Sequence, residues 1–195
     1  MQREIFIDTG TSRLFVIKDF TANYFNDLTN VISQLNYEPE IEVCNKICTQ
    51  HRNIGFYSND SIGYMYSKRL MKSQPLNDKV LVKLLNQVNK ELGTQFNGIL
   101  VNEYTDGEKY IGKHSDDEKD LDKKTLCVAG IAYGATRTFR IRDIETRKIV
   151  KDIQHEPCML IVMDGDFQKE FTHEIPQQKK IKESRVSLTF RHHTK

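Results

Sequence analysis

Two stretches of the chain carry apolar residues at the three- and four-residue spacing of a helix. The first begins at Thr21, which can cap a helix, and its apolar positions are Tyr24, Leu28, Val31 and Leu35. The second runs from about Asp78 to Leu92 and ends before a helix-stopping glycine; its apolar stripe is Leu81, Leu84, Leu85, Val88 and Leu92. Both stretches predict helices that cover another layer.

From residue 98 onward the pattern changes to short runs typical of β-strands, separated by glycine-containing turns. The predicted strands are 99–104, 127–133, 138–144, 159–163, a strand that ends at Pro176, and 185–191. A few helices followed by many short strands predict an α+β protein, with helices packed on one face of a β-sandwich or jelly roll.

Composition narrows the class of protein. The 195 residues are 38% hydrophobic and 29% charged with a net charge of +2, which suits a single domain over 1–195 and decides nothing about nucleic acid. No apolar run is long enough to span a membrane, and the N-terminal residues lack a secretory signal. The four scattered cysteines then indicate free thiols in an intracellular protein, in nucleus or cytoplasm. A zinc site built on Cys44, Cys48 and His51 lacks a fourth ligand at suitable spacing.

The last predicted strand has two chemically different faces. Val186, Leu188 and Phe190 alternate with a polar face that consists of Arg185, Ser187, Thr189 and Arg191. Two long arginines on one face can hold the two ends of a small dicarboxylate. The alternative is an exposed basic strand beside a lysine-rich segment.

A set of three residues, all earlier in the chain than that strand, forms a pattern that suits a metal ion. In an extended chain the side chains of His114 and Asp116 point the same way, and His173 lies in another predicted strand. Two histidines and one carboxylate are the facial triad that binds non-haem Fe(II) and leaves coordination positions open. His-x-Asp alone is common in loops, but the triad followed by two arginines on a final strand is far more specific.

With these residues in view, the sequence resembles the AlkB family of Fe(II)- and 2-oxoglutarate-dependent dioxygenases, which repair alkylated bases, and within it the eukaryotic DNA-repair homologues. The similarity covers about residues 40–191. The matching segments are Asn102-Glu-Tyr-Thr-Asp-Gly107, Ile111-Gly-Lys-His-Ser-Asp-Asp-Glu118, Tyr133-Gly-Ala-Thr-Arg-Thr-Phe139, His173 and Arg185-Val-Ser-Leu-Thr-Phe-Arg191. The resemblance implies a double-stranded β-helix (jelly roll), with a nucleotide-recognition region at about 40–72 and a catalytic core at about 98–191.

The resemblance also implies roles for individual residues. The iron ligands would be His114, Asp116 and His173. The 2-oxoglutarate site would comprise Asn102, Tyr104, Arg185, Ser187, Thr189 and Arg191, with Arg185 at the distal carboxylate and Arg191 near the iron. Ser187 departs from the asparagine usual in the family; it can still donate a hydrogen bond, but it is shorter.

On the substrate side the resemblance implies that Arg52, Tyr64, Tyr66 and Glu118 contact the nucleic acid. Tyr66 would stack on a flipped base, and Glu118 would read its edge. The alternative for Tyr64 and Tyr66 is that both belong to the hydrophobic core, and the alternative for Glu118 is that it belongs to a solvated acidic run. Relatives carry a wedge where this chain has Val43-Cys44-Asn45, which is small and predicts a preference for single strands. A phosphate groove would be lined by Lys68, Arg69, Lys72, Arg137, Arg140 and Arg142.

The function implied by the resemblance is oxidative dealkylation of N-alkylated DNA bases such as 1-methyladenine and 3-methylcytosine, with Fe(II), 2-oxoglutarate and O2, by a monomer that contacts no membrane. Two alternatives stay open: the same chemistry on RNA or a protein side chain, and a non-catalytic nucleic-acid reader with this fold. A zinc hydrolase is less consistent with the sequence, because Arg185 and Arg191 would then have no role.

Overall fold

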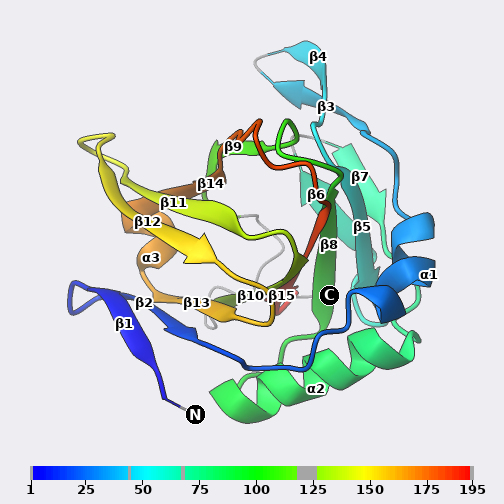
Figure 1. The fold of residues 1–195 in the computed structure, drawn as a ribbon, viewed down its shortest axis with the longest axis horizontal. Coiled ribbons are helices and arrows are strands. Elements are labelled where there is room, and N and C mark those ends of the chain that lie inside the picture. Colours follow the sequence, from blue (N-terminus) through cyan, green and yellow to red (C-terminus); the bar gives the residue numbers. More distant parts are fainter. Residues whose placement is uncertain (1, 44, 67–68, 118–126, 194–195) are drawn as a thin grey trace.

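The computed structural model describes residues 2–43, 45–66, 69–117 and 127–193. Two antiparallel sheets face each other and enclose the site (Figure 1). The larger sheet has seven strands in the order β1 (Glu4–Asp8), β2 (Ser12–Ile17), β13 (Leu160–Gly165), β10 (Val128–Gly134), β15 (Arg185–Arg191), β8 (Gly98–Tyr104) and β5 (Asn53–Ser58). The smaller sheet has four, in the order β12 (Ile149–His155), β11 (Arg137–Asp143), β14 (Phe171–Ile175) and β9 (Ile111–His114). The expected jelly-roll class is confirmed.

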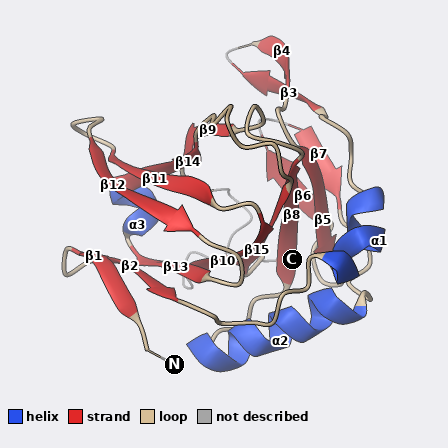
Figure 2. Cartoon of the chain, in the orientation of Figure 1, coloured by secondary structure: helices blue, strands red, loops and turns tan. Residues whose placement is uncertain are grey.

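The predicted second helix is present as α2 (Lys79–Leu92). Its N-terminus is capped by the Asp78 side chain, which accepts hydrogen bonds from two backbone N–H groups, and its C-terminus by Gly93 at φ 67°. The apolar stripe of α2 is buried in one hydrophobic cluster with Ile99, Val186 and other residues of the larger sheet. Helix α2 therefore covers the outer face of that sheet, as predicted (Figure 2).

The predicted helix over 21–35 is wrong in extent. Only a short 3-10 turn, η1 (Asn26–Leu28), and α1 (Thr29–Ser33) form there. Thr21 caps neither of them; its hydroxyl shares a 2.9 Å hydrogen bond with the Tyr133 hydroxyl. Asparagine and β-branched residues propagate a helix poorly, so this segment depends on the burial of Leu28 and Val31 and on the hydrogen bond that the Tyr57 hydroxyl donates to the Val31 carbonyl oxygen.

The strands predicted after residue 98 are observed, but β9 was not among them, and β12 was missed too. Its burial alternates only at the end, where Ile153 and His155 are buried, because it lies at the edge of the smaller sheet. The strands before residue 98 were not predicted either. Two of their hairpins, β3–β4 (Glu40–Val43, Lys46–Thr49) and β6–β7 (Gly63–Tyr66, Arg69–Lys72), lie outside the two main sheets. The short helix α3 (Phe167–Glu170) precedes β14.

Strand β15 positions the site. It lies between β8 and β10, with Arg185 opposite Tyr104 and Ser187 opposite Asn102 on β8. Its apolar face packs toward α2, and its polar face points into the space between the two sheets. None of the described helices is long and apolar enough to cross a membrane.

Candidate functional site

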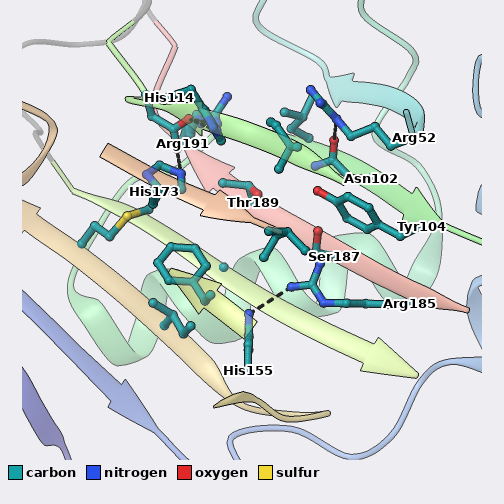
Figure 3. A pocket seen from close by; sticks show the side chains of 18 of the residues that line it. Arg52, Asn102, Tyr104, His114, His155, His173, Arg185, Ser187, Thr189 and Arg191 are labelled. Atoms are coloured by element: carbon teal, nitrogen blue, oxygen red, sulfur yellow. Dashed lines mark hydrogen bonds and ion pairs between the residues drawn. The ribbon is translucent and has the colours of Figure 1, made fainter. Parts of the chain in front are cut away.

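A pocket between the two sheets brings together residues from nine strands and two loops (Figure 3). Its polar lining comprises Arg52, Asn102, Tyr104, His114, Asp116, His155, His173, Arg185, Ser187, Thr189 and Arg191. All three predicted metal ligands and all six predicted 2-oxoglutarate residues therefore line one cavity.

The triad lies at one end of the pocket. His114 on β9 pairs with His173 on β14, and Asp116 follows two residues after the end of β9. The Asp116 carboxylate lies 3.7 Å from Nε2 of His114 and 3.9 Å from Nε2 of His173. One nitrogen or oxygen from each residue lies within 4.8 Å of the others, the spacing of ligands around one ion. Among the described residues, this is the one His/Cys/Asp/Glu group able to hold a metal.

Neighbouring groups orient these ligands. Nδ1 of His114 lies 2.9 Å from the Gly112 carbonyl oxygen, which can only accept, so Nδ1 carries the proton and the Nε2 lone pair faces Asp116. The Phe139 ring stacks on the His173 ring at 5.1 Å. Oδ2 of Asp116 is buried and has no hydrogen-bond partner within the described part of the chain. A buried carboxylate oxygen in that state fits a metal ligand.

The protonation states also suit a metal. Burial alone would raise the pKa of Asp116, but Arg191 and the two histidines together hold that pKa well below its usual range. Burial, His114 and Arg191 lower the pKa of His173 to about 3, and burial lowers the pKa of His114. At neutral pH the site therefore offers an ionised carboxylate and two neutral imidazoles, the forms that bind divalent ions.

The opposite end of the pocket carries a buried cation. Arg185 is 2% exposed, and burial lowers its pKa to about 10, so it stays charged at neutral pH. Its Nη2 lies 3.1 Å from Nδ1 of His155. Over the residues that the structure describes, no carboxylate pairs with Arg185, and its Nε and Nη1 have no hydrogen-bond partner.

The two ends of β15 are thus electrostatically different. At the triad end, Nη2 of Arg191 donates a 2.6 Å hydrogen bond to Asp116, whereas no carboxylate of the described residues compensates the charge of Arg185. Ser187 and Thr189 lie between them on the same strand face. A small dicarboxylate with one end at the metal and the other at Arg185 fits this arrangement.

The model of the family described as 2OG-Fe(II) oxygenase superfamily matches residues 23–191. The chain belongs to this superfamily. Its members require Fe(II), 2-oxoglutarate and O2. The triad is consistent with that requirement, and so is Arg185, which pairs with no carboxylate among the described residues.

Similar proteins narrow the relationship to AlkB homologues, as the sequence resemblance predicted. The human alpha-ketoglutarate-dependent dioxygenase alkB homolog 3 is 34% identical over 140 residues, which are 66% of this chain and 47% of that protein. The Bos taurus DNA oxidative demethylase ALKBH2 is 29% identical over 159 residues, 77% of this chain and 56% of that protein. The chain spans about half the length of these relatives.

Solved structures support the fold. The structure of OsALKBH1 superposes with a TM-score of 0.62 at 16% identity, covering 98% of this chain and 100% of that one. A 2OG-Fe(II) oxygenase family oxidoreductase from Burkholderia pseudomallei gives a TM-score of 0.56 at 12% identity, covering 94% and 85% of the two chains.

In this member of the superfamily the predicted substrate residues fall into two groups. Arg52 and Tyr64 are described and buried, at 4% and 2% exposure, in the pocket wall. Nε of Arg52 donates a 2.8 Å hydrogen bond to Oδ1 of Asn102, so a predicted substrate residue contacts a predicted co-substrate residue. The guanidinium of Arg191 lies 5.1 Å from the centre of the Tyr64 ring. The side chain of Tyr66, and all of Glu118, lie outside the described residues.

The three arginines of the predicted phosphate groove that lie on β11 all have partners within the protein, and burial excludes Arg137 from such a groove. Arg137 is completely buried and donates hydrogen bonds to the carbonyl oxygens of Asp106, Lys109 and Pro176, so it ties loops together. Arg140 pairs with Asp152, and Arg142 pairs with Glu174. Of the remaining members, Lys72 is exposed on β7, whereas Lys68 and the side chain of Arg69 lie outside the described residues.

Sequence reasoning missed one polar pocket residue, His155. Its strand was not predicted, and a histidine near a turn carries no motif of its own. The available signal was its two-residue spacing from the apolar Ile153 at the end of β12.

The zinc interpretation of the cysteines gains no support: Cys48 is free and exposed, and Cys44 lies outside the described residues.

Proposed function

We propose that this protein is an AlkB-type dioxygenase that oxidatively removes N-linked alkyl groups from nucleic-acid bases such as 1-methyladenine and 3-methylcytosine. One observation carries the proposal: the His114, Asp116 and His173 triad shares a pocket with Arg185, whose buried charge has no carboxylate partner in the described part of the chain. The names of the relatives, a dioxygenase and a DNA oxidative demethylase, supply the class of reaction.

The chain's own residues divide the work. The triad would hold Fe(II), which with 2-oxoglutarate supplies oxidation of the alkyl C–H bond by O2, yielding succinate and CO2. Arg185, helped by Tyr104, binds the distal carboxylate, and Arg191 holds Asp116 in place while lying beside the metal-proximal end. The hydroxylated alkyl group then leaves the base nitrogen as an aldehyde, which is formaldehyde for a methyl group.

We expect this protein to prefer a nucleic acid in which the modified base is unpaired. Hairpin β3–β4 ends in a turn at Asn45, with φ 60°, and carries the exposed Ile47 on β4. Most of the expected wedge at 43–45 lies outside the part of the chain that the structure describes, because Cys44 and the side chain of Val43 are not among the described groups. The prediction from its sequence therefore stands as made. A weak wedge recovers less of the free-energy cost of extracting a base from duplex DNA, whereas a single-stranded substrate needs no such recovery.

The test uses oligonucleotides with one 1-methyladenine or 3-methylcytosine, as single-stranded DNA, matched duplex and single-stranded RNA. With Fe(II), 2-oxoglutarate and O2 we expect unmodified base, succinate and formaldehyde in equal amounts, measured by mass spectrometry. Single-stranded DNA should react about tenfold faster than duplex if a deficit of about 1.4 kcal/mol reaches the transition state. The Cys44→Phe variant should narrow that gap, with Cys48→Phe on the same hairpin as the control.

Each alternative gives a different result. Consumption of 2-oxoglutarate with RNA or a protein as the sole productive substrate would replace the DNA assignment. Binding of methylated oligonucleotides with no consumption of 2-oxoglutarate would indicate a reader. Equal rates on single strands and duplex would refute the wedge argument and leave the metal site untouched.

A further inference from the structure

His155 is a buried polar residue that none of the assignments above explains. It ends β12, where the strand is otherwise mostly exposed, yet it is only 3% exposed itself. Its ring lies beneath the Arg185 end of the pocket and points at the guanidinium (Figure 3). The triad lies at the other end of β15, so His155 is not a metal ligand.

The surroundings of the ring fix its tautomer. Nε2 lies 3.1 Å from the carbonyl oxygen of Met159, which can only accept, so Nε2 carries the proton. The turn after β12 places this carbonyl group beside the ring. It includes Cys158, which has a φ of 66° and whose N–H donates a hydrogen bond to the Ala132 carbonyl oxygen. Nδ1 is left with a lone pair, and Nη2 of Arg185 donates to it at 3.1 Å.

The ring also remains uncharged. Burial, followed by the charge of Arg185, lowers the pKa of His155 to about 3, so protonation does not compete at neutral pH. A neutral acceptor orients a guanidinium without cancelling its charge. An aspartate or glutamate at this place would pair with Arg185 in the buried pocket and compete with any carboxylate ligand.

We propose that His155 is a positioning residue, which in its neutral Nε2–H tautomer fixes the guanidinium of Arg185 and leaves the charge, Nε and Nη1 free for the distal carboxylate of 2-oxoglutarate. The proposal rests on the co-substrate site of the proposed function. Nε and Nη1, which have no hydrogen-bond partner among the described residues, are the donors that a carboxylate would accept from, and His155 occupies the remaining nitrogen, Nη2. Arg137, which lies opposite His155 on β11, cannot take the place of His155 as the acceptor for Arg185. It is itself a cation, and its N–H groups are bonded to carbonyl oxygens.

The experiment compares His155→Gln, His155→Glu and His155→Leu. Binding of 2-oxoglutarate is measured by calorimetry on protein loaded with Mn(II), without nucleic acid or turnover. Glutamine can accept from Arg185 and donate to the Met159 carbonyl, so its Kd should stay within about threefold of wild type. Leucine removes the acceptor and should weaken binding about tenfold, as expected for the loss of one hydrogen bond to a charged group. Glutamate is nearly the same size as glutamine but adds a charge, and it should weaken binding at least about thirtyfold.

Four further measurements separate positioning from a general structural role. Mn(II) affinity should be unchanged in every variant, and the exposed neighbour Gln154→Leu should bind 2-oxoglutarate like wild type. In turnover, His155→Leu should raise the KM for 2-oxoglutarate and leave kcat at saturation within about twofold. The ¹⁵N shifts of the His155 ring in wild type should report a protonated Nε2 and an unprotonated Nδ1.

The proposal would be overturned if the His155→Glu and His155→Gln variants bound 2-oxoglutarate with equal affinity. A His155 ring protonated on Nδ1 in the wild type would overturn it too. If the leucine variant does not fold, the glutamine–glutamate pair and the ring shifts still decide the question. A protein that binds 2-oxoglutarate as described but dealkylates no oligonucleotide would refute the proposed function and leave this inference standing.

Discussion

Replacing Asp116 by asparagine removes the only negative charge of the triad while keeping the shape of the side chain. The carboxylate is buried, lies within 4 Å of both histidines and has an unpartnered Oδ2 among the described residues. We expect Asp116→Asn to lose at least about a hundredfold in metal affinity, since even the outer partners of metal ligands are worth about 10- to 100-fold.

Thermal stability converts this loss into a measurement. A ligand that binds only the native state adds about 2.7 kcal/mol at a hundred times its Kd, and a chain of this size gains about 2–4 °C in Tm per kcal/mol. Mn(II) at that concentration should therefore raise the Tm of the wild type by about 5–11 °C. With a Kd a hundredfold weaker, the same metal concentration adds only about 0.4 kcal/mol, or about 1–2 °C.

The assay is differential scanning calorimetry of each protein with and without Mn(II). The metal-induced shift is compared rather than Tm itself, because the substitution also weakens the 2.6 Å contact with Arg191. Asp117→Asn is the matched control: the same chemical change at the next, exposed position should keep the full shift. A full shift in Asp116→Asn, or its loss in Asp117→Asn, would refute the assignment of the ligand.

Three further outcomes are expected. Arg185→Ala should raise the 2-oxoglutarate requirement at least tens of fold, because truncating a buried charged contact costs about 2–5 kcal/mol; an unchanged KM would contradict its role. Arg137→Met leaves three carbonyl oxygens without their donor and should lower the free energy of unfolding in urea by about 3 kcal/mol or more, whereas the exposed Lys148→Met should be neutral. The pKa values of buried His155 and His193 are about 3 and 4, against about 6.5 unfolded, so the unfolded chain takes up protons first as pH falls. Stability should thus be full above about pH 6.5, and each histidine should remove about 1.4 kcal/mol between pH 7.5 and 5.5; a His155→Gln/His193→Gln variant that loses as much as wild type would refute this.

The sequence alone determined those features that depend on local periodicity. The alternation over 185–191 defined both faces of β15, because successive side chains on a strand must point to opposite sides. The stripe of α2, with Asp78 and Gly93 at its ends, defined that helix for the same kind of reason. The His-x-Asp spacing placed His114 and Asp116 together, and the strand predicted to end at Pro176 supplied His173 as the third candidate ligand.

Only the tertiary structure decided which side chains meet across strands. Arg137 and Arg140 look alike in the sequence, yet one is enclosed by the carbonyl groups of loops and the other pairs with Asp152 on the neighbouring strand. His155 is a pocket residue because β12 pairs with β11 and because the following turn places the Met159 carbonyl oxygen within hydrogen-bond distance of the ring. Strand pairing joins residues far apart in the chain, and the charge and hydrogen bonds of a buried group depend on these neighbours. Local pattern therefore determined the direction of a side chain, whereas its partner was fixed only when the sheets assembled.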